Sequence, residues 1–377
     1  MKSLLLTAAL FLAGGIAAAE FGQAAPPLDV DRVIGGKRFR IEDMAGKKMV
    51  VLHFWTRDCR PCDNAVPLIA EAARRFGGST VFLAVGDSDA RSVEEYPQLE
   101  ALTIPAAVDN LSKTADAYLR ETDRLPTDVV IGRDGRVAWI GPTVELPRVL
   151  EEINAGKYDI RAAIDLDSFN QKMVRLLKEK DYEGAFATVQ ERRKAFPDDL
   201  GLAIGAANLL AGQLERTDDA LKLLDDCIKR FPDEFPLYNA KLRILHFGGQ
   251  PDPRVVPIYH AIAERFAAAK PMLLVQLADN LQKAPPGRYP LLSSYELAAA
   301  AWKSEGFRSD AERGRAAAAL ARCYYALGMI DEAVKLQNRS VMWLRGAPDE
   351  KRLIRDLALY RDAQETAREV RRREVKK

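Results

Sequence analysis

A pair of cysteines at the start of a predicted helix constrains this chain more than any other sequence feature. Residues 50–55 (VVLHFW) form an apolar run of strand length, rich in β-branched and aromatic residues, and predict a buried strand. Cys59 and Cys62 come soon after it, and apolar residues then recur at helical spacing until Gly77. A second strand is predicted over 80–85. This segment therefore predicts a strand–helix–strand unit whose helix begins with a Cys-x-x-Cys motif.

The position at a helix N-terminus gives the two cysteines different chemistry. A helix N-terminus carries partial positive charge and free N–H groups, which favour a thiolate at Cys59. Arg57 and Arg60 add positive potential, whereas Asp58 opposes it. Cys62 lies one turn further into the helix, where it can attack a mixed disulfide at Cys59. The motif thus predicts a redox disulfide, Cys59–Cys62, with Cys59 as the nucleophile and Cys62 as the resolving cysteine.

A structural zinc site is the alternative interpretation of a Cys-x-x-Cys motif, but it needs a second pair of ligands. The other two cysteines, Cys227 and Cys323, lie 96 residues apart, and the three histidines show no metal-ligand spacing. The sequence therefore predicts no metal. It also predicts no cofactor, because phosphate-binding glycine motifs are absent. We expect Cys227 and Cys323 to be buried free thiols, although a disulfide between them stays open.

The residues around the motif resemble the TlpA/ResA-like thiol–disulfide oxidoreductases of the thioredoxin superfamily. The resemblance includes the pattern Phe-Trp-x3-Cys-x2-Cys at 54–62 and the Leu-Pro-Thr strand and hairpin at 125–141. Residues 35–47 are similar to the family's short hairpin before the first core strand, and 104–109 to its next strand. The match covers about residues 28–155. It implies a two-domain chain that starts with an α/β thioredoxin fold, in which helices flank a central mixed sheet.

The resemblance also implies roles for residues around the motif. Pro126 takes the place of the family's cis-proline, which faces the Cys-x-x-Cys motif and presents backbone to the substrate. The residues expected to line the substrate site adjoin the motif or this proline, and they are Trp55, Arg60, Pro61, Leu125 and Thr127. For Trp55 we favour a second interpretation, in which the ring is a packing surface beside the motif.

His53 is a departure from the family pattern. It lies six residues before Cys59, where thioredoxins keep a buried acid that relays protons to the second cysteine and TlpA-like relatives often carry an amide. A neutral imidazole could accept a proton from Cys62. The other interpretation, which we favour at this stage, is a buried, hydrogen-bonded histidine whose charged form is disfavoured by desolvation.

The second half of the chain predicts helical repeats. Ala185 and Ala220 are each followed twelve residues later by the proline of a Phe-Pro-Asp sequence, which gives an offset of 35 residues. A third copy surrounds Ala333. The pattern resembles the 34-residue tetratricopeptide repeat (TPR) and predicts an all-α, TPR-like solenoid over 160–367. Its concave surface would bind a protein or peptide, whereas a helical cap or dimerisation module is the alternative.

Both ends of the chain carry recognisable signals. Residues 1–19 combine one lysine, an apolar run and three consecutive alanines at the end, which predicts a cleaved secretory signal and a periplasmic protein. An uncleaved membrane anchor is the alternative, although the run is shorter than the ~20 residues that span a bilayer. Residues 368–377 hold six basic and two acidic residues and predict a solvated basic tail. With a net charge of only +2, the chain predicts no nucleic-acid partner.

Together these features predict an extracytoplasmic thiol–disulfide oxidoreductase that acts on protein substrates. The resemblance to the TlpA-like family implies that it acts as a reductant and is itself reduced by a membrane partner. A disulfide oxidase or isomerase stays open, because Arg60 favours the thiolate and hence a more oxidising potential. A protein-binding adaptor with a vestigial thioredoxin domain is the alternative from another class. A peroxidase is not expected, because Thr56 precedes the cysteine as in peroxiredoxins but their upstream proline is missing.

Overall fold

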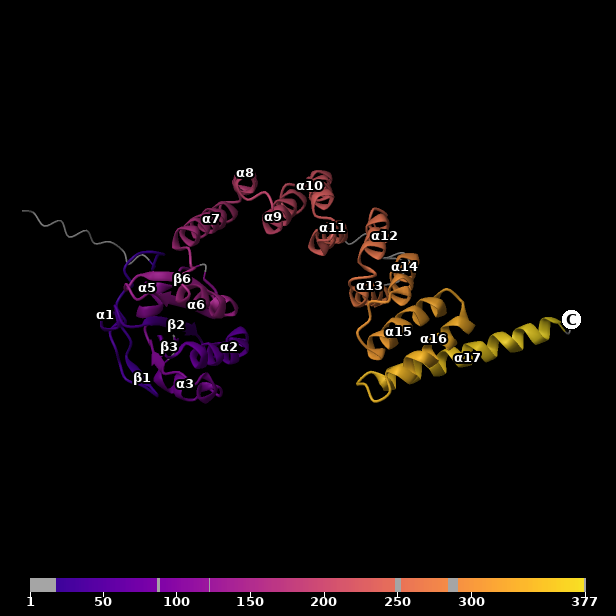
Figure 1. Cartoon of the computed structure of the whole chain (residues 1–377), viewed down its shortest axis with the longest axis horizontal. Helices are drawn as coiled ribbons and strands as arrows, with labels where there is room; N and C mark the ends of the chain where they lie inside the picture. The colour runs from indigo at the N-terminus through magenta and orange to yellow at the C-terminus, as the bar shows by residue number, and fades with distance from the viewer. Residues whose placement is uncertain (1–17, 87–88, 122, 248–251, 284–290, 376–377) are drawn as a thin grey trace, which may run out of the picture. The chain divides into compact units, whose positions relative to one another are not determined.

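The computed structural model describes residues 18–86, 89–121, 123–247, 252–283 and 291–375. These residues form two compact units, which meet in the sequence between Val174 and Arg175 (Figure 1). The predicted signal peptide lies outside the described residues except for its last two positions. Within the described part of the chain, no helix is both long enough and apolar enough to span a membrane.

The first unit is built on a mixed six-stranded sheet with the strand order β1-β4-β3-β2-β5-β6. The strands are β1 (Arg32–Ile34), β2 (Met49–Trp55), β3 (Thr80–Gly86), β4 (Ala106–Val108), β5 (Thr127–Ile131) and β6 (Val137–Pro142). The pairs β2–β3 and β3–β4 are parallel, whereas β1, β5 and β6 run antiparallel to their neighbours. The predicted strand–helix–strand unit is confirmed, because α2 (Arg60–Phe76) connects the parallel strands β2 and β3.

Strand β2 is buried along its whole length, and its side chains alternate between the two faces of the sheet. Val51 and Trp55 lie in an apolar cluster with Cys62 of α2. Leu52 and Phe54 lie in a separate apolar cluster, on the other face. This alternation decides which β2 side chains lie beneath the Cys-x-x-Cys motif.

Short helices complete the first unit, and one of them corrects a prediction. These helices are α1 (Ile41–Met44), α3 (Ala90–Glu94), α4 (Leu99–Leu102), α5 (Lys113–Tyr118), the 3₁₀ helix Thr143–Glu145 and α6 (Leu146–Asn154). The hairpin expected over 35–47 was wrong. Strand β1, at the edge of the sheet, pairs instead with β4, and a single helical turn, α1, buries Ile41.

Helix α7 (Ile160–Lys178) begins in the first unit. The two terminal nitrogens of Arg120 donate hydrogen bonds of 2.7 and 2.9 Å to the carboxylate of Asp167 on α7. Both side chains are largely buried, at 20% and 17% exposure, so the pair fastens the start of α7. The sequence places the start of the helical domain at residue 160, whereas residues 160–174 belong to the compact first unit.

The described residues of the second unit are nearly all helical and have a solenoid-like arrangement. Its helices are α8 (Tyr182–Ala195), α9 (Leu200–Gly212), α10 (Thr217–Arg230), α11 (Phe235–Phe247), α12 (Val255–Phe266), α13 (Pro271–Lys283), α14 (Leu291–Lys303), α15 (Asp310–Ala326), α16 (Ile330–Trp343) and α17 (Glu350–Val375). Each helix packs against the next one or two along the chain. The predicted basic tail continues α17 without a break up to Val375.

Corresponding residues in the copies of the repeat have equivalent backbone geometry. The three repeat alanines, Ala185, Ala220 and Ala333, are fully buried. Each lies five residues after a residue in the left-handed conformation, and these residues are Lys180, Glu215 and Gly328. Both Phe-Pro-Asp sequences lie between helices, and their phenylalanines cap the preceding helix with nearly identical dihedral angles. Cys227 and Cys323 are buried free thiols, as expected.

Candidate active site

The Cys-x-x-Cys motif forms the N-terminus of α2. Cys59 is the N-cap residue of this helix, and it forms a disulfide with Cys62. The backbone N–H of Cys62 donates a hydrogen bond of 3.1 Å to the Sγ atom of Cys59. Cys62 is only 1% exposed, whereas Cys59 is partly exposed. Of the two sulfur-bearing residues, Cys59 is therefore the one that another molecule can reach.

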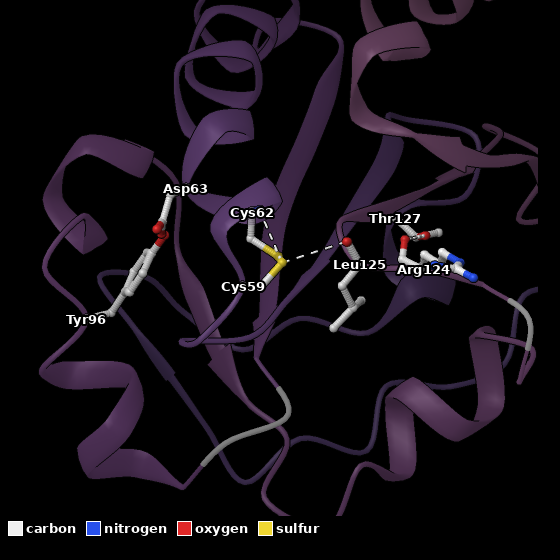
Figure 2. Close-up of a disulfide and its surroundings, with 7 residues drawn as sticks. All are labelled: Cys59, Cys62, Asp63, Tyr96, Arg124, Leu125 and Thr127. Atoms are coloured by element: carbon white, nitrogen blue, oxygen red, sulfur yellow. Dashed lines mark hydrogen bonds between the residues drawn. A yellow bond between two sulfur atoms is a disulfide. The ribbon is translucent and has the colours of Figure 1, made fainter. Parts of the chain in front are cut away.

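Pro126 lies opposite Cys59, and the Leu125–Pro126 peptide bond is cis. Figure 2 shows the Leu125 carbonyl oxygen directed at the disulfide, 3.7 Å from the Sγ atom of Cys59. The hydroxyl of Thr127 donates a hydrogen bond of 2.8 Å to the Arg124 carbonyl and so closes the turn into β5. The backbone before β5 thereby forms one wall of the site.

A buried polar pair lies in the sheet on the face that α2 covers. His53 on β2 and Asp128 on β5 are directly opposite each other in the antiparallel register. The Nδ1 atom of His53 lies 2.7 Å from Oδ1 of Asp128, and the two residues are 1% and 0% exposed. His53 alternates with Val51 and Trp55, which belong to the same apolar cluster as Cys62. The predicted hydrogen-bonded histidine is therefore present, and its partner is a carboxylate.

Trp55 and Tyr96 pack beside the first turn of α2, on the side away from the Leu125–Pro126 backbone. Their ring centroids lie 4.3 Å apart, and Trp55 is only 3% exposed, so its ring packs against the protein and offers little surface to a substrate. The Tyr96 hydroxyl donates a hydrogen bond of 2.7 Å to Oδ1 of Asp63, the residue after Cys62 (Figure 2). Burial and the neighbouring Asp63 carboxylate raise the pKa of Tyr96, which keeps the phenol protonated as the donor.

This geometry agrees with the comparisons to known proteins. A family model described as the AhpC/TSA family matches residues 21–140. Thiol-disulfide oxidoreductase ResA from Bacillus cereus is 29% identical over 120 residues, which are 31% of this chain and 67% of ResA. The thioredoxin-like protein YneN from Bacillus subtilis is 25% identical over 153 residues, 39% of this chain and 79% of YneN. The N-terminal unit is a TlpA/ResA-like thiol–disulfide oxidoreductase domain.

A solved structure, StoA from Bacillus subtilis, aligns with 33% of this chain and 98% of StoA at 23% identity, with a TM-score of 0.28. The family model ends at residue 140, before α7 begins. The family match therefore concerns the TlpA/ResA-like domain.

The charges around the motif of the TlpA/ResA-like domain are more balanced than the sequence suggests. Arg57 lies 3.8 Å from the carboxylate of Glu95, an opposite charge that partly offsets it. Arg60 is exposed, and Asp63 brings a carboxylate into the first turn of α2. Stabilisation of a Cys59 thiolate therefore depends mainly on the Cys62 N–H and the helix N-terminus rather than on side-chain cations.

The structure brings most of the predicted site residues together and adds three that the sequence analysis missed. Cys59, Cys62, Leu125 and Pro126 meet at one point. The residues missed are Asp63, Tyr96 and Asp128. A weak signal existed for Asp128, because it alternates with the buried Val130 and so shares its face of the sheet. Nothing local links Tyr96 to Asp63, because Asp63 lies in α2 and Tyr96 lies in the loop between α3 and α4.

Proposed function

We propose that this oxidoreductase exchanges its Cys59–Cys62 pair with disulfides of protein substrates, as a reductant, outside the cytoplasm. The observation that carries the proposal is the unequal exposure of the two cysteines. An accessible Cys59 can attack a substrate, whereas a buried Cys62 can react only with a partner already bound to Cys59.

The reaction balances with the two cysteines alone. The Cys59 thiolate attacks one sulfur of a substrate disulfide, and the other substrate sulfur leaves as a thiolate. Cys62 then loses its proton and attacks Cys59 Sγ, which releases the second substrate thiolate. The substrate gains two electrons, and the Cys59–Cys62 disulfide remains. A second protein dithiol, which we propose to be a membrane redox partner, must reduce this disulfide in turn.

The direction of electron flow follows from how strongly the site stabilises the Cys59 thiolate. A strongly stabilised thiolate favours the reduced protein and makes it an oxidant. Glu95 offsets Arg57, and the Asp63 carboxylate lies in the same helical turn as the motif. These contacts weaken the contribution that the arginines were expected to make, which supports the reductant over the oxidase or isomerase.

The substrate is proposed to be a protein that lies along the backbone before β5. The Leu125 carbonyl faces the reactive sulfur, so it can accept a hydrogen bond from an extended substrate segment. The helical unit is proposed to bind a partner protein or peptide on its TPR-like surface. The predicted signal peptide supports a periplasmic site of action.

The test uses the protein without residues 1–19 and three variants, Cys59→Ser, Cys62→Ser and Cys227→Ser. Reduction of a protein disulfide such as that of insulin should fall to background in Cys59→Ser. Cys62→Ser should accumulate a mixed disulfide at Cys59, and mass spectrometry of the trapped complex should identify substrates in a periplasmic extract. Cys227→Ser is the matched control, because that thiol is buried in the second unit and should leave the rate unchanged.

Two measurements separate the parts of the proposal. Equilibration with glutathione buffers gives the reduction potential, and a potential as oxidising as that of the periplasmic oxidant DsbA, about −120 mV, would overturn the reductant role. If Cys59→Ser reduces insulin as fast as the unmodified protein, the exchange mechanism itself fails.

A further inference from the structure

A hollow in the second unit combines an apolar base with an excess of positive charge. It has a volume of about 450 Å³ and lies between α8 and α10, both of which pack against α9. Phe186, Leu210 and Leu223 form its apolar lining. Four cationic and two carboxylate side chains also line it. Which of these charges already have a partner decides what the hollow can bind.

Two of the four cations are paired with carboxylates of the chain itself. The Nε atom of Arg216 donates a hydrogen bond of 2.8 Å to the carboxylate of Asp219, which is one of the two carboxylates of the hollow. A terminal nitrogen of Arg230 donates a hydrogen bond of 2.7 Å to the carboxylate of Asp198. These two arginines therefore have their charge offset within the protein.

The other two cations of the hollow, Arg193 and Lys222, have no such partner. The second carboxylate of the hollow, Asp226, is engaged by Lys229, whose ammonium group donates a hydrogen bond of 2.9 Å to it. Among the described residues, no carboxylate lies within ion-pair distance of Arg193 or Lys222. The hollow therefore has two positive charges to offer to a ligand.

Arg193 is held in place without being neutralised. One terminal nitrogen of its guanidinium group donates a hydrogen bond of 2.7 Å to the side-chain oxygen of Gln190, and the other lies 3.8 Å from the Sγ atom of Cys227. The arginine is half-buried, and a charge that is partly withdrawn from water is costly unless an opposite charge accompanies it. The hollow thus presents a positioned cation that lacks its anion.

The helical repeat does not require these two cations. At the 35-residue offset, Arg193 corresponds to Ile228, and Lys222 corresponds to Ala187. The neighbouring copy of the repeat thus folds with an apolar residue at each position. A role in the fold therefore does not account for the two charges, which points to a role in binding.

We propose that this hollow binds an acidic segment of a partner protein, whose carboxylates pair with Arg193 and Lys222. An apolar side chain of the same segment contacts Phe186 and Leu223. This inference rests on the proposed partner-binding role of the helical unit, and it places that role on α8 and α10. Two unpaired cations match one or two carboxylates, whereas a nucleic-acid strand brings a negative charge with every nucleotide. The apolar base likewise favours a peptide that has an apolar residue beside an acidic one.

The proposal is tested by binding of a defined peptide to the protein without residues 1–19. The probe is a peptide in which glutamate alternates with leucine, labelled with tetramethylrhodamine and followed by fluorescence anisotropy. Two control peptides carry lysine or glutamine in place of glutamate. We expect the glutamate peptide to bind at least about tenfold more tightly than either control at low ionic strength, and to be released as salt screens the charges. Equal binding of the glutamate and lysine peptides would overturn the proposal.

Matched variants show whether the attraction comes from this hollow. Arg193→Gln should weaken binding of the glutamate peptide about tenfold, because it removes charge-assisted hydrogen bonds to a carboxylate. Lys222→Gln should weaken binding about threefold, as expected for an exposed ion pair. Lys222 is exposed, so this variant tests the proposal even if Arg193→Gln fails to fold.

Lys194→Gln is the charge-matched control. Lys194 is the next residue of α8, lies outside the hollow and pairs with Glu191 at 2.7 Å. Its replacement should leave the affinity within about twofold of the unmodified protein, as expected for an exposed pair of this kind. If Lys194→Gln weakens binding as much as Lys222→Gln does, the attraction is a general effect of charge and the proposal is wrong.

A photo-crosslink locates the bound peptide without any variant. With benzoylphenylalanine in place of one leucine, the cross-links should fall on α8 or α10, and cross-links confined to other helices would refute the inference. An oligonucleotide that displaces the peptide at a lower concentration of charge than the unlabelled peptide itself would assign the hollow to phosphate and also overturn the proposal.

These outcomes are distinct from failure of the proposed function. If the peptide does not bind but Cys59→Ser loses insulin reduction, the exchange mechanism holds and only the docking site is lost. If the peptide binds as expected but Cys59→Ser still reduces insulin at the full rate, the exchange mechanism fails and the docking site remains.

Discussion

Three turns of the helical unit, each five residues before a repeat alanine, pass through a residue in the left-handed region of backbone space, and they allow a precise test of the repeat. The φ angles are +59° at Lys180, +56° at Glu215 and +77° at Gly328. A residue with a Cβ atom pays about 1–2 kcal/mol in this conformation, whereas glycine adopts it freely. Glycine in turn loses about 0.5–1 kcal/mol more chain entropy on folding. The side chains of Lys180 and Glu215 are exposed, so little else changes on substitution.

We therefore expect Lys180→Gly and Glu215→Gly each to raise the free energy of unfolding by about 0.5–1 kcal/mol, the difference between these two costs. Gly328→Ala should lower it by about 1 kcal/mol. No atom lies within 4 Å of a Cβ built at Gly328, so the loss would be conformational rather than steric. In a unit of this size, each kcal/mol shifts the melting temperature by about 2–4 °C.

Differential scanning calorimetry of the full chain measures these shifts. Gly205→Ala is the matched control, because Gly205 lies inside α9 with open space around it, and alanine there should stabilise the helix by about 0.8–1 kcal/mol. The same glycine-to-alanine change thus has opposite signs at the two positions. The reasoning is refuted if both glycine substitutions lower the melting temperature, or if Gly328→Ala and Gly205→Ala shift it in the same direction.

Three further predictions concern single residues of the same unit. Gly314→Ala would place a Cβ 2.8 Å from Cγ of Leu344 and should cost about 1–3 kcal/mol in urea unfolding, and an unchanged midpoint would contradict this. The hydrogen-bonded Glu296 raises the pKa of His260. The unmodified protein should therefore have a higher free energy of unfolding than His260→Gln below about pH 6.5, and this difference should disappear as pH rises through the raised pKa. A difference that grows with rising pH would refute the prediction. Burial raises the pKa of the Cys323 thiol, so iodoacetamide at pH 7.5 should label Cys323 only after unfolding in urea.

Much of the fold could be predicted from local patterns. The apolar run before Cys59 and the helical spacing after Cys62 identified β2 and α2, because both elements are specified by neighbours in the chain. The repeat was visible for the same reason, since its buried alanines and Phe-Pro-Asp turns recur at a constant offset. The hairpin expected over 35–47 was wrong because β1 finds its partner in β4, more than 70 residues away in the chain.

The buried polar pair beside the motif could be predicted only in outline. His53 was singled out by its distance from Cys59, and a buried, hydrogen-bonded histidine was expected. Its partner was not named, because nothing near residue 53 indicates which strand lies beside β2 or in which register. A shift of one residue between β2 and β5 would turn Asp128 to the opposite face of the sheet. The same limitation applies to Tyr96 and Asp63.

The sequence by itself determined which residues can react and where they begin a helix. The order of strand, cysteine pair and helix is a local property, and so is the spacing that makes Cys59 an N-cap and Cys62 a buried neighbour. Only the tertiary structure decided what surrounds them: the Leu125 carbonyl at the reactive sulfur, the Tyr96 hydroxyl on Asp63, and the Asp128 carboxylate on His53. These contacts join residues that are between 33 and 75 positions apart, and strand register and helix packing, which no local pattern specifies, bring them together.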